Sequence, residues 1–354
     1  MLFTSIQVKN VRNINNIHLQ PCSKLNLLVG PNGSGKTAFL EGIHILSRAK
    51  SFRTPRIREV IQRQQAAITV TAEVLNSQQL RAVTGIEKSY GKTLIKYQGR
   101  PLKTVSEQAR NIPLVFITPD SHTLVTGSPK DRRHWLDWAL FHVEPAYIDQ
   151  WKDYQTALRN RNNLLKQSSS NSQLQPWEKT LAEGAEKLDK FREEFFSALQ
   201  VSFNETIQGV FEAKSTLCLE KGEAPGTSLL GYLTNCRDQD RRFGYTRFGP
   251  HKADLLFSNS GEKVSRVFSR GQIKRFVLAL QLALARVFED LNGEKPVLLV
   301  DDYSAELDEE AQSKVLAQLQ SYAGQVFLTS TEMDAELANL ADSRVFHVER
   351  GNIN

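Results

Sequence analysis

Hydrophobic positions recur with two different periods along this chain, and the change of period marks its parts. Residues 25–29 form a short apolar run that predicts a buried strand, and from Lys36 onward apolar residues recur every three or four positions, as on one face of a helix. Residues 67–99 alternate between apolar and polar, with a turn at 90–92, which predicts an antiparallel meander packed on this first βα unit. Another apolar strand is predicted at 114–117.

The middle of the chain has a helical period. Between about residues 129 and 245, apolar faces at 146–165 and 177–203 flank the serine-rich stretch 168–172, and a short polar linker of this kind favours an antiparallel helical hairpin. Strands and helices then alternate again, as an apolar helix at 272–288, a strand at 297–300, a helix at 309–320 and a strand at 326–329. The pattern predicts an α/β domain split between residues 1–120 and 245–354, with a helical lobe inserted at 121–244.

The strand at 25–29 leads directly into a complete G-x-x-x-x-G-K-[ST] pattern. Its glycines allow successive backbone N–H groups to turn toward phosphates, and the positive end of the following helix adds to the attraction. In such a loop the lysine, Lys36, reaches the β- and γ-phosphates, and the hydroxyl of Thr37 ligates Mg²⁺. We therefore expect ATP and Mg²⁺ to bind at Gly30, Pro31, Asn32, Gly33, Ser34, Gly35, Lys36 and Thr37.

Two further motifs lie near the other end of the chain. A serine and a glycine precede the helix at 272–288, where a hydroxyl, an N–H group and the helix dipole together attract anionic oxygens; the candidate ATP contacts there are Ser269, Arg270, Gly271 and Gln272. The strand at 297–300 ends in Asp301 and Asp302, at the edge where open α/β sheets bind ligands. We expect Asp301 to hold Mg²⁺ through water and Asp302 to orient the attacking water as a general base.

The composition argues against a membrane-spanning protein, a disulfide-linked protein and a cysteine metal cluster. The formal net charge of +6 is mildly basic and only hints at a polyanionic partner. No apolar stretch of the sequence approaches the ~20 residues that span a bilayer. Three scattered cysteines are too few for a disulfide framework or a metal cluster, and we expect them to be neutral thiols in a reducing compartment. The expected location is cytoplasmic, with no membrane partner, and the family resemblance described below implies association with the nucleoid.

Basic residues gather at three places along the sequence. The candidate contacts to a polyanion from the first two are Arg53, Arg56, Arg58, Lys130, Arg132 and Arg133, which the family resemblance described next makes candidate DNA contacts, and a third cluster lies at 237–247. Lysine and arginine near phosphates give salt-dependent binding that is blind to base sequence. A solvated basic face or internal ion pairs remain the alternative for each cluster. Arg53 is also close enough in sequence to the phosphate-loop helix to contact nucleotide instead.

Together these motifs resemble the RecF family of the ABC/SMC-like ATPases, over essentially the whole chain. The resemblance includes Asn10-x-Arg12-Asn13, Lys50-Ser51-Phe52-Arg53, Thr118-Pro119-Asp120, Gly249-Pro250-His251-Lys252, the signature at 269–272 and the paired aspartates. It implies an ABC-type P-loop ATPase head with an antiparallel β subdomain. It also implies an ATP-dependent homodimer, in which the signature of one copy covers the ATP of the other, and a switch at Ser330 or Thr331.

The same resemblance implies a function. The family clamps double-stranded or gapped DNA near single-strand gaps, has weak DNA-stimulated ATPase activity, and works with RecR and RecO to promote RecA loading. Ala305 departs from the serine of the family's D-loop, and Asp302 stands where transporter ATPases have glutamate, so slow hydrolysis is expected. Asp120 or Ser121 occupies the place of the Q-loop residue. The alternatives are the ATPase of another SMC-like or OLD-type DNA-processing system and a transporter ATPase subunit.

Overall fold

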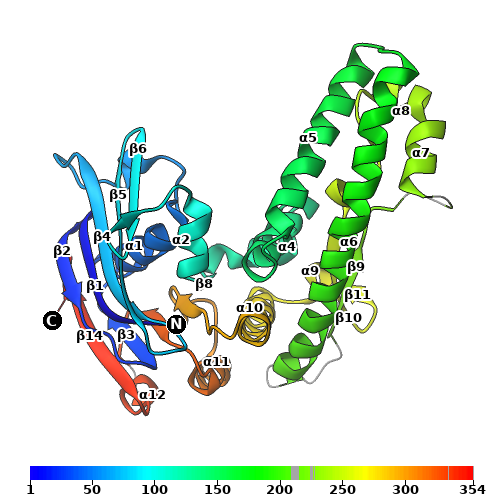
Figure 1. The fold of residues 1–354 in the computed structure, drawn as a ribbon. Coiled ribbons are helices and arrows are strands. Elements are labelled where there is room, and N and C mark those ends of the chain that lie inside the picture. The colour runs from blue at the N-terminus through cyan, green and yellow to red at the C-terminus, as the bar shows by residue number, and fades with distance from the viewer. Residues whose placement is uncertain (209–214, 224–225, 227, 334, 354) are drawn as a thin grey trace. The chain divides into compact units, whose positions relative to one another are not determined.

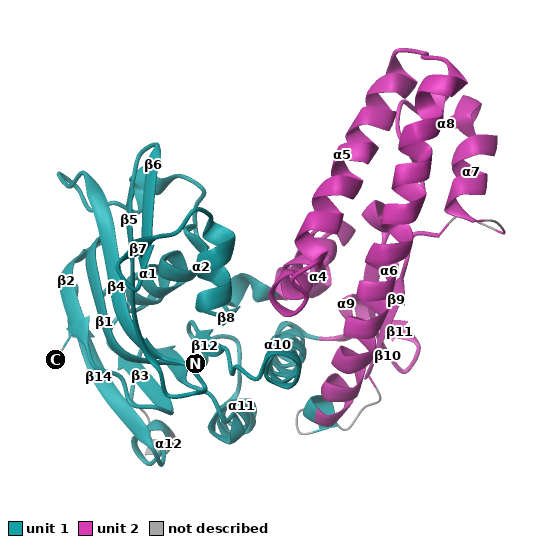
Figure 2. Ribbon diagram, in the orientation of Figure 1, with its two compact units in different colours: residues 1–121, 206–210, 269–354 teal, residues 122–205, 211–268 magenta. Residues whose placement is uncertain are grey.

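A computed structural model describes residues 1–208, 215–223, 226, 228–333 and 335–353. Their contacts divide the chain into two compact units (Figure 2). Unit 1 comprises residues 1–121, 206–210 and 269–354, and unit 2 comprises residues 122–205 and 211–268. Among the helices of the described ranges, none is both long enough and apolar enough to cross a membrane.

The first sheet of unit 1 is mostly parallel, with the strand order β15-β14-β3-β13-β12-β8 (Figure 1). Four of its strands, β3, β13, β12 and the edge strand β8, are short and mostly apolar with almost every residue buried, as expected for strands covered on both faces. The strands are β3 Leu25–Val29, β8 Leu114–Ile117, β12 Val297–Val300, β13 Val326–Ser330, β14 Ser343–Glu349 and β15 Asn352–Ile353. The predicted strands at 25–29, 114–117 and 297–300 are confirmed to the residue.

The helices of unit 1 include the three that the periodicity predicts, from Lys36 onward, at 272–288 and at 309–320. They are α1 Lys36–Arg48, α2 Val105–Asn111, α10 Arg270–Asn292, α11 Glu309–Ser321 and the short α12 Ala335–Ala338, with single 3₁₀ turns η1 Ile57–Glu59 and η2 Pro119–His122. The helix predicted at 272–288 is longer at both ends, because Ser269 caps its start and Gly293, with φ 67°, caps its end.

The second sheet of unit 1 is antiparallel, with the order β2-β1-β4-β5-β6-β7. Its strands are β1 Leu2–Val11, β2 Ile14–Leu19, β4 Ala67–Leu75, β5 Arg81–Ser89, β6 Lys92–Tyr97 and β7 Arg100–Pro101. The meander predicted at 67–99 forms β4, β5 and β6. The sheet also includes β1 and β2, because β1 pairs with β4 across more than fifty intervening residues, a pairing that local alternation does not specify.

One apolar core joins the two sheets through α1. Phe3 of β1 meets Phe327 of β13 edge to face, with ring centroids 6.2 Å apart, and both side chains are fully buried. Gly42 of α1 faces Val8 of β1 so closely that a Cβ there would lie 2.9 Å from Val8 Cγ1. The loop at the start of α1 is therefore fixed to both sheets.

Unit 2 is helical with one small sheet. Its long helices α5 Tyr147–Lys166 and α6 Asn171–Gln208 run antiparallel (Figure 1), as the serine-rich linker predicts. Its other helices are α3 Thr123–Thr126, α4 Pro129–Val143, α7 Leu229–Asn235, α8 Arg237–Phe243 and α9 Val264–Val267, with a 3₁₀ turn η3 Pro250–Lys252. The three-stranded sheet β11-β10-β9 comprises β9 Ser215–Glu220, β10 Asp254–Asn259 and β11 Glu262–Lys263.

A buried cluster of charges holds α5, α6 and α8 together. The fully buried guanidinium of Arg161 lies 3.3 Å from Glu178 Oε1 and 2.9 Å from Asp240 Oδ2. Arg237 pairs with the same glutamate and Arg247 with the same aspartate, the latter at 2.9 Å. Most basic residues of the third cluster, at 237–247, thus form internal ion pairs, which the sequence analysis gave as the alternative to contacts with a polyanion.

Residues 245–268 pack in a different unit from the one that the sequence pattern predicts. The sequence pattern assigns them to the ATPase domain, whereas they pack within unit 2. The reason is long-range pairing, since β10 pairs with β9 and Asp254 accepts two hydrogen bonds from Arg132 of α4, at 2.8 and 2.9 Å. Neither partner is visible from local periodicity.

Candidate functional site

The loop at 30–37 leaves β3 and leads into α1. Gly33 and Gly35 have φ values of 77° and 122°, a backbone conformation that favours glycine. Gly30 has no space for a side chain, because a Cβ there would lie 2.2 Å from a carbonyl oxygen of β14. Asn13 Nδ2 donates to Gly33 O at 3.0 Å and holds the loop from the side. Each glycine of the motif is therefore required by the local geometry.

Lys36 begins α1 and turns back over the loop. Its Nζ donates to Gly30 O at 2.6 Å and to Pro31 O at 3.0 Å. Burial lowers the pKa of Lys36, and the charges of Asp302 and Asp301 act against that change. Because the partly desolvated ammonium group of Lys36 donates to these loop carbonyls, it can exchange the carbonyl oxygens for phosphate oxygens when a nucleotide binds.

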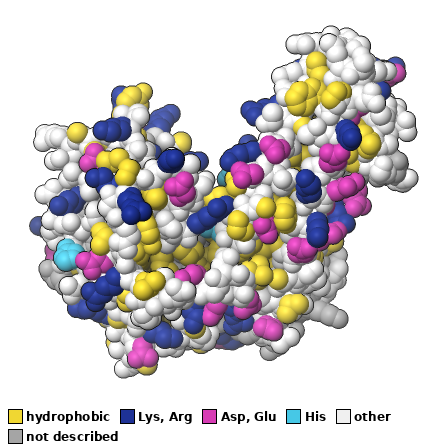
Figure 3. Space-filling view, viewed as in Figure 1, with side chains coloured by type: hydrophobic (Ala, Val, Ile, Leu, Met, Phe, Trp, Pro, Cys, Tyr) yellow, Lys and Arg dark blue, Asp and Glu magenta, His cyan; other side chains and the backbone are white. Residues whose placement is uncertain are grey.

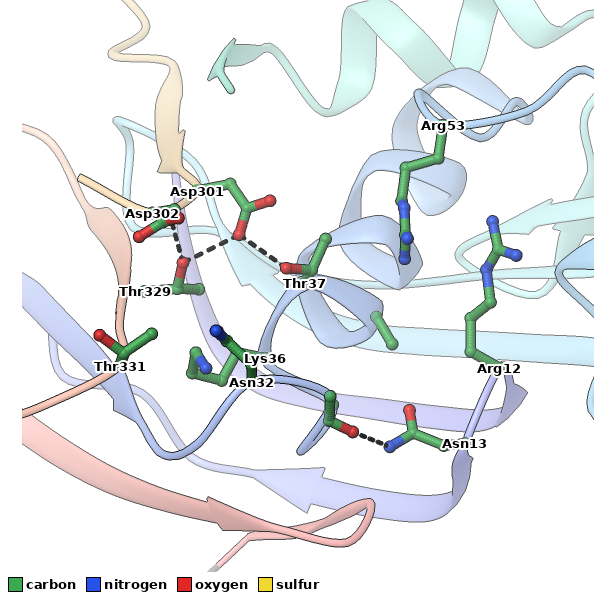
Figure 4. Close-up of a pocket in the computed structure, with 13 residues that line it drawn as sticks. Arg12, Asn13, Asn32, Lys36, Thr37, Arg53, Asp301, Asp302, Thr329 and Thr331 are labelled. Carbon is green, nitrogen blue, oxygen red and sulfur yellow. Dashed lines mark hydrogen bonds between the residues drawn. The ribbon is translucent and has the colours of Figure 1, made fainter. Parts of the chain in front are cut away.

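Hydroxyl and carboxylate groups meet at the carboxyl edge of the parallel sheet (Figure 4). Asp301 Oδ1 accepts from Thr37 Oγ1 at 2.9 Å and from Thr329 Oγ1 at 2.8 Å. Burial raises the pKa of Asp301, with the two hydroxyls acting in the opposite direction. Thr37 and Asp301, the two residues predicted to hold Mg²⁺, are thus in direct contact.

Thr329 is a site residue that the motifs do not mark. It is fully buried near the end of β13, and besides donating to Asp301 it accepts a hydrogen bond from Asp302 N at 2.7 Å. Its position at the carboxyl edge of the sheet, one strand away from the aspartates, is the indication that could have identified it.

Asp302 has an unusual backbone conformation. Its φ is 52°, in the left-handed region that a residue with a Cβ seldom adopts. The conformation is held by Thr329 on one side and by Lys274 of α10 on the other, whose Nζ donates to Asp302 O at 2.8 Å and to Ala305 O at 2.7 Å. Burial lowers the pKa of Lys274 to about 8. The helix behind the signature is thereby tied to the segment that follows β12.

A cavity of about 190 Å³ joins these groups (Figure 4). It is lined by Arg12, Asn13, Asn32, Gly33, Gly35, Lys36, Thr37, Ala38, Arg53, Asp301, Asp302, Thr329 and Thr331. In the loop itself, the hydroxyl of Ser34 is buried with no hydrogen-bond partner in the described part of the chain. A cation, a helix N-terminus, an unpaired hydroxyl and a hydroxyl–carboxylate pair fit a triphosphate with its Mg²⁺.

The two switch candidates differ in position. Ser330 is buried, and its Oγ donates to Glu332 O at 2.7 Å, while its carbonyl accepts from Gly30 N at 3.3 Å. Thr331 lines the cavity. Thr331 is therefore the better placed of the two to sense a ligand there.

The signature residues 269–272 lie at the start of α10. Ser269 accepts from Gln272 N at 3.3 Å and its own N–H donates to Gln272 Oε1 at 2.8 Å, forming a capping box. Ser269 and Arg270 are exposed, and Arg270 approaches Glu306 at 3.6 Å. Among the described residues that line the nucleotide cavity, none belongs to this motif. The structure therefore does not bring the two predicted ATP motifs together within one chain.

The first cluster of candidate DNA contacts divides into two kinds. Arg53 lines the nucleotide cavity, and its charge acts on the Asp301 carboxyl (Figure 4). Arg56 is exposed beside Glu59, and Arg58 stacks its guanidinium 3.9 Å from the centre of the Tyr90 ring. The nucleotide alternative therefore fits Arg53, whereas Arg56 and Arg58 face solvent.

The second cluster is less available to DNA than the sequence predicts. Arg132 is buried in its ion pair with Asp254 and also donates to Gly127 O at 2.8 Å, so internal pairing is the better interpretation for it. Arg133 donates to Ala253 O at 2.7 Å. Lys130 is exposed.

The first cluster of predicted contacts is part of a larger positive surface of unit 1. Residues 50–110 contain twelve lysines and arginines against four acidic residues, an excess larger than the net charge of the whole chain. All twelve except Lys88 are exposed, and Figure 3 shows lysine and arginine side chains spread over the part of unit 1 that contains β5 and β6. A running sum of charge along the sequence would have found this surface.

Comparisons with known proteins agree with this geometry. The model of the RecF/RecN/SMC N terminal domain matches residues 2–354. The chain is 35% identical over 361 residues to the DNA replication and repair protein RecF of Pseudomonas aeruginosa strain LESB58, covering 100% of this chain and 97% of that protein. It is also 35% identical to the protein of the same name from Psychromonas ingrahamii, covering 100% of this chain and 99% of that one.

Solved structures give the same result. The structure of the recombination mediator protein RecF-ATP in the RecFOR pathway matches with a TM-score of 0.85 and 25% identity, over 99% of this chain and 96% of that chain. An SMC head bound to the C-winged helix domain of ScpA matches with a TM-score of 0.63 and 16% identity, over 100% of this chain and 96% of that chain, which shows the fold alone. The predicted α/β ATPase-head fold is confirmed.

Proposed function

The chain belongs to the RecF family of the RecF/RecN/SMC ATPases, and on that basis we propose that it is an ATP-dependent DNA-binding ATPase of recombinational repair. In this proposal two copies of the chain form a dimer, and each ATP is bound between them. The phosphate loop of one copy binds the triphosphate, and Ser269, Arg270, Gly271 and Gln272 of the other copy cover it. The observation that carries this function is that one chain presents both motifs, yet the signature is absent from the described lining of its own nucleotide cavity.

The exposed cap of α10 suits binding in trans. Ser269 and the helix N-terminus are exposed to solvent, where an anionic oxygen from a second molecule can reach the hydroxyl and the N–H groups. A site that needs both copies makes ATP the link between them, and loss of the γ-phosphate contacts would open the dimer.

Five residues of the cavity have distinct parts in hydrolysis. Lys36 and the loop N–H groups bind and orient the triphosphate, and Thr37 with Asp301 would hold Mg²⁺, which when bound neutralises charge on the phosphate oxygens. Asp302 orients the attacking water, and Thr331 contacts the γ-phosphate region. Aspartate is shorter than glutamate, so the water is less tightly placed and turnover is slow. Membership of the RecF family is the basis for proposing that this weak activity is stimulated by DNA.

The surface at 50–110 is the better DNA interface. Its exposed lysines and arginines give unit 1 a broad positive face that matches a phosphate backbone, whereas Arg132 is already neutralised by Asp254. DNA bound there is double-stranded or gapped. With RecR and RecO as partners, the ATP-bound dimer marks single-strand gaps and promotes RecA loading, a role in keeping with the RecFOR pathway to which the similar RecF structure is assigned.

Molecular mass and DNA affinity, each measured with and without ATP, test this function. Wild-type protein should double in mass and bind gapped duplex only with ATP, and Lys36→Met should do neither, because it removes the cation that contacts the triphosphate. Salt titration of Arg56→Ser/Arg58→Ser should reduce the slope of log affinity against log salt by about 1–2. An Arg159→Met control, at an exposed position of unit 2, should leave that slope unchanged.

A wild-type protein that stays monomeric with ATP and gapped DNA would contradict the shared site. Equal DNA affinity with and without ATP would contradict the coupling between nucleotide and DNA. The two results are independent, so the assay separates the dimer from the DNA interface.

A further inference from the structure

Two exposed aromatic rings lie at one end of unit 2. Phe243, the last residue of α8, is 57% exposed, and Tyr245 is 43% exposed. Their ring centroids are 6.0 Å apart and their planes are inclined at 55°. Figure 3 shows hydrophobic side chains on the surface of the end of unit 2 where α5 and α6 meet. Large aromatic rings left in water commonly mark a surface that binds something.

Basic side chains surround this pair. Lys166 lies against Gly244 between the two rings, Arg247 and Lys252 each lie over one ring, and the exposed Arg242 directly precedes Phe243 in the chain. Lys252 Nζ lies 4.9 Å from the centre of the Tyr245 ring, and the Arg247 guanidinium lies 5.1 Å from that of Phe243. The exposed carboxylate of Asp238 is already paired with Arg241 at 2.8 Å. Arg247 is itself paired with Asp240 at 2.9 Å, so the exposed positive charge beside the rings comes from Lys166, Arg242 and Lys252.

The aromatic pair is held rigidly from beneath. Between the rings, Gly244 has φ 74° and caps α8, which lets the chain reverse direction. Thr246 donates from both its N–H and its hydroxyl to Asn162 Oδ1, each at 2.8 Å, and its hydroxyl accepts from the fully buried Arg161 at 2.8 Å. The buried ionic cluster of unit 2 thus fixes the segment that presents the two rings.

We infer that Phe243 and Tyr245 form a stacking platform for the unpaired bases of single-stranded DNA. This inference rests on the DNA-binding function proposed above and assigns it a second surface, separate from the face at 50–110. Aromatic rings stack on bases of any sequence, and nearby cations attract the phosphates between those bases.

The chemistry favours a single strand over other occupants. In a duplex the base faces are already stacked on one another, so a ring can reach them only in an unpaired segment. An apolar protein surface would be poorly matched by the exposed cations Lys166, Arg242 and Lys252. An acidic protein partner is the remaining alternative, and it would not depend on the π faces of the rings.

A double variant tests the platform. Phe243→Leu/Tyr245→Leu keeps apolar side chains at exposed positions but removes both π faces. Binding is measured by fluorescence anisotropy with an oligothymidylate that contains one fluorescent base analogue, and with a blunt duplex plus ATP. Single-strand affinity should fall at least about fivefold, with loss of the quenching that stacking causes, while duplex affinity stays at the wild-type value.

Leu230→Ala is the matched control, since Leu230 is another exposed apolar residue of unit 2, on α7. Arg242→Ser, which leaves the rings in place, should lower the salt slope of single-strand binding by about 1.

The outcomes separate the two proposals. Unchanged single-strand affinity and quenching in the double variant would overturn the platform and favour an acidic protein as the partner of the rings. The proposed binding of duplex DNA would not be affected by that result. Equal losses for single strand and duplex would overturn the assignment to unpaired bases. A wild-type protein that binds duplex but no single strand overturns the platform alone, and one that binds neither overturns the DNA-binding function as well.

Discussion

Thr329→Val tests the arrangement of the two aspartates by removing one hydroxyl. Thr329 donates to Asp301 at 2.8 Å and accepts from Asp302 N at 2.7 Å, and it is fully buried. Valine has nearly the same shape, so no cavity forms and the change isolates these two hydrogen bonds. Asp301 keeps only Thr37 as a side-chain donor among the contacts described above, and the N–H of Asp302 loses its acceptor.

The size of the effect follows from the two lost bonds. A hydrogen bond to a charged group contributes about 1.5–3 kcal/mol, and an unsatisfied buried N–H costs about 1–3 kcal/mol, so unfolding of unit 1 should become easier by roughly 3–5 kcal/mol. Asp302 also holds a left-handed backbone that costs about 1–2 kcal/mol, and the lost bond helped to maintain it. A displacement of its carboxylate by ~1 Å is enough to slow hydrolysis about 10²-fold.

Three measurements separate these effects. Urea unfolding gives the stability loss, calorimetry with a non-hydrolysable ATP analogue gives affinity, and single-turnover hydrolysis gives the chemical step. Stability and hydrolysis should fall while affinity changes little, because the loop contacts of Lys36 are untouched. Thr93→Val, at an exposed hydroxyl of β6 that accepts from Lys88, is the control and should change none of them. Hydrolysis at the wild-type rate in Thr329→Val would refute the role given to this hydroxyl.

Three further changes have defined outcomes. Arg161→Met should destabilise unit 2 by about 3–5 kcal/mol in urea unfolding, because two carboxylates stay buried without their shared cation, and Arg159→Met at an exposed position of the same helix should not; equal stability of the two variants would contradict this. Burial lowers the pKa of His251 to about 4, whereas the unfolded side chain titrates near 6.5, so the unfolded state binds more protons between these values and stability falls by about 3 kcal/mol as pH drops through that window. His251→Gln should flatten this dependence, and an unchanged slope would show that other groups cause it. Lys274→Met removes the donor to two carbonyls after β12 and should slow single-turnover hydrolysis about tenfold with nucleotide affinity retained, whereas a wild-type rate would show that the link is dispensable.

Local geometry explains which parts of the site could be predicted from sequence. The phosphate loop needs glycine at Gly33 and Gly35 because of positive φ, and a strand, a loop and a helix in succession suffice to place Lys36. The pairing of Thr37 with Asp301 follows once both lie at the same sheet edge. The resemblance to the RecF family is confirmed, since relatives at 35% identity span the full chain.

Long-range partners explain the rest. Nothing near Arg132 in the sequence indicates that Asp254 neutralises it, and nothing near Arg161 indicates that two distant acids surround it. The roles assigned to the site residues stay predictions until variants are measured. Thr329 and the full extent of the basic surface at 50–110 were within reach of the sequence, through strand ends and running charge, but no motif points to Thr329, and the predicted DNA contacts include only Arg53, Arg56 and Arg58 of that surface.

Mixing two inactive variants tests the shared ATP site most directly. Lys36→Met removes the cation of the phosphate loop, and Ser269→Asp keeps a good helix cap while placing a negative charge where the triphosphate of the second copy would approach. Each variant alone should be inactive in ATP hydrolysis. Mixed in equal amounts, they should recover about a quarter of wild-type activity, because half of the dimers are mixed and each of those holds one intact site of two. No recovery from a mixture shown to form mixed dimers, or full activity of Ser269→Asp on its own, would contradict a site made by two copies.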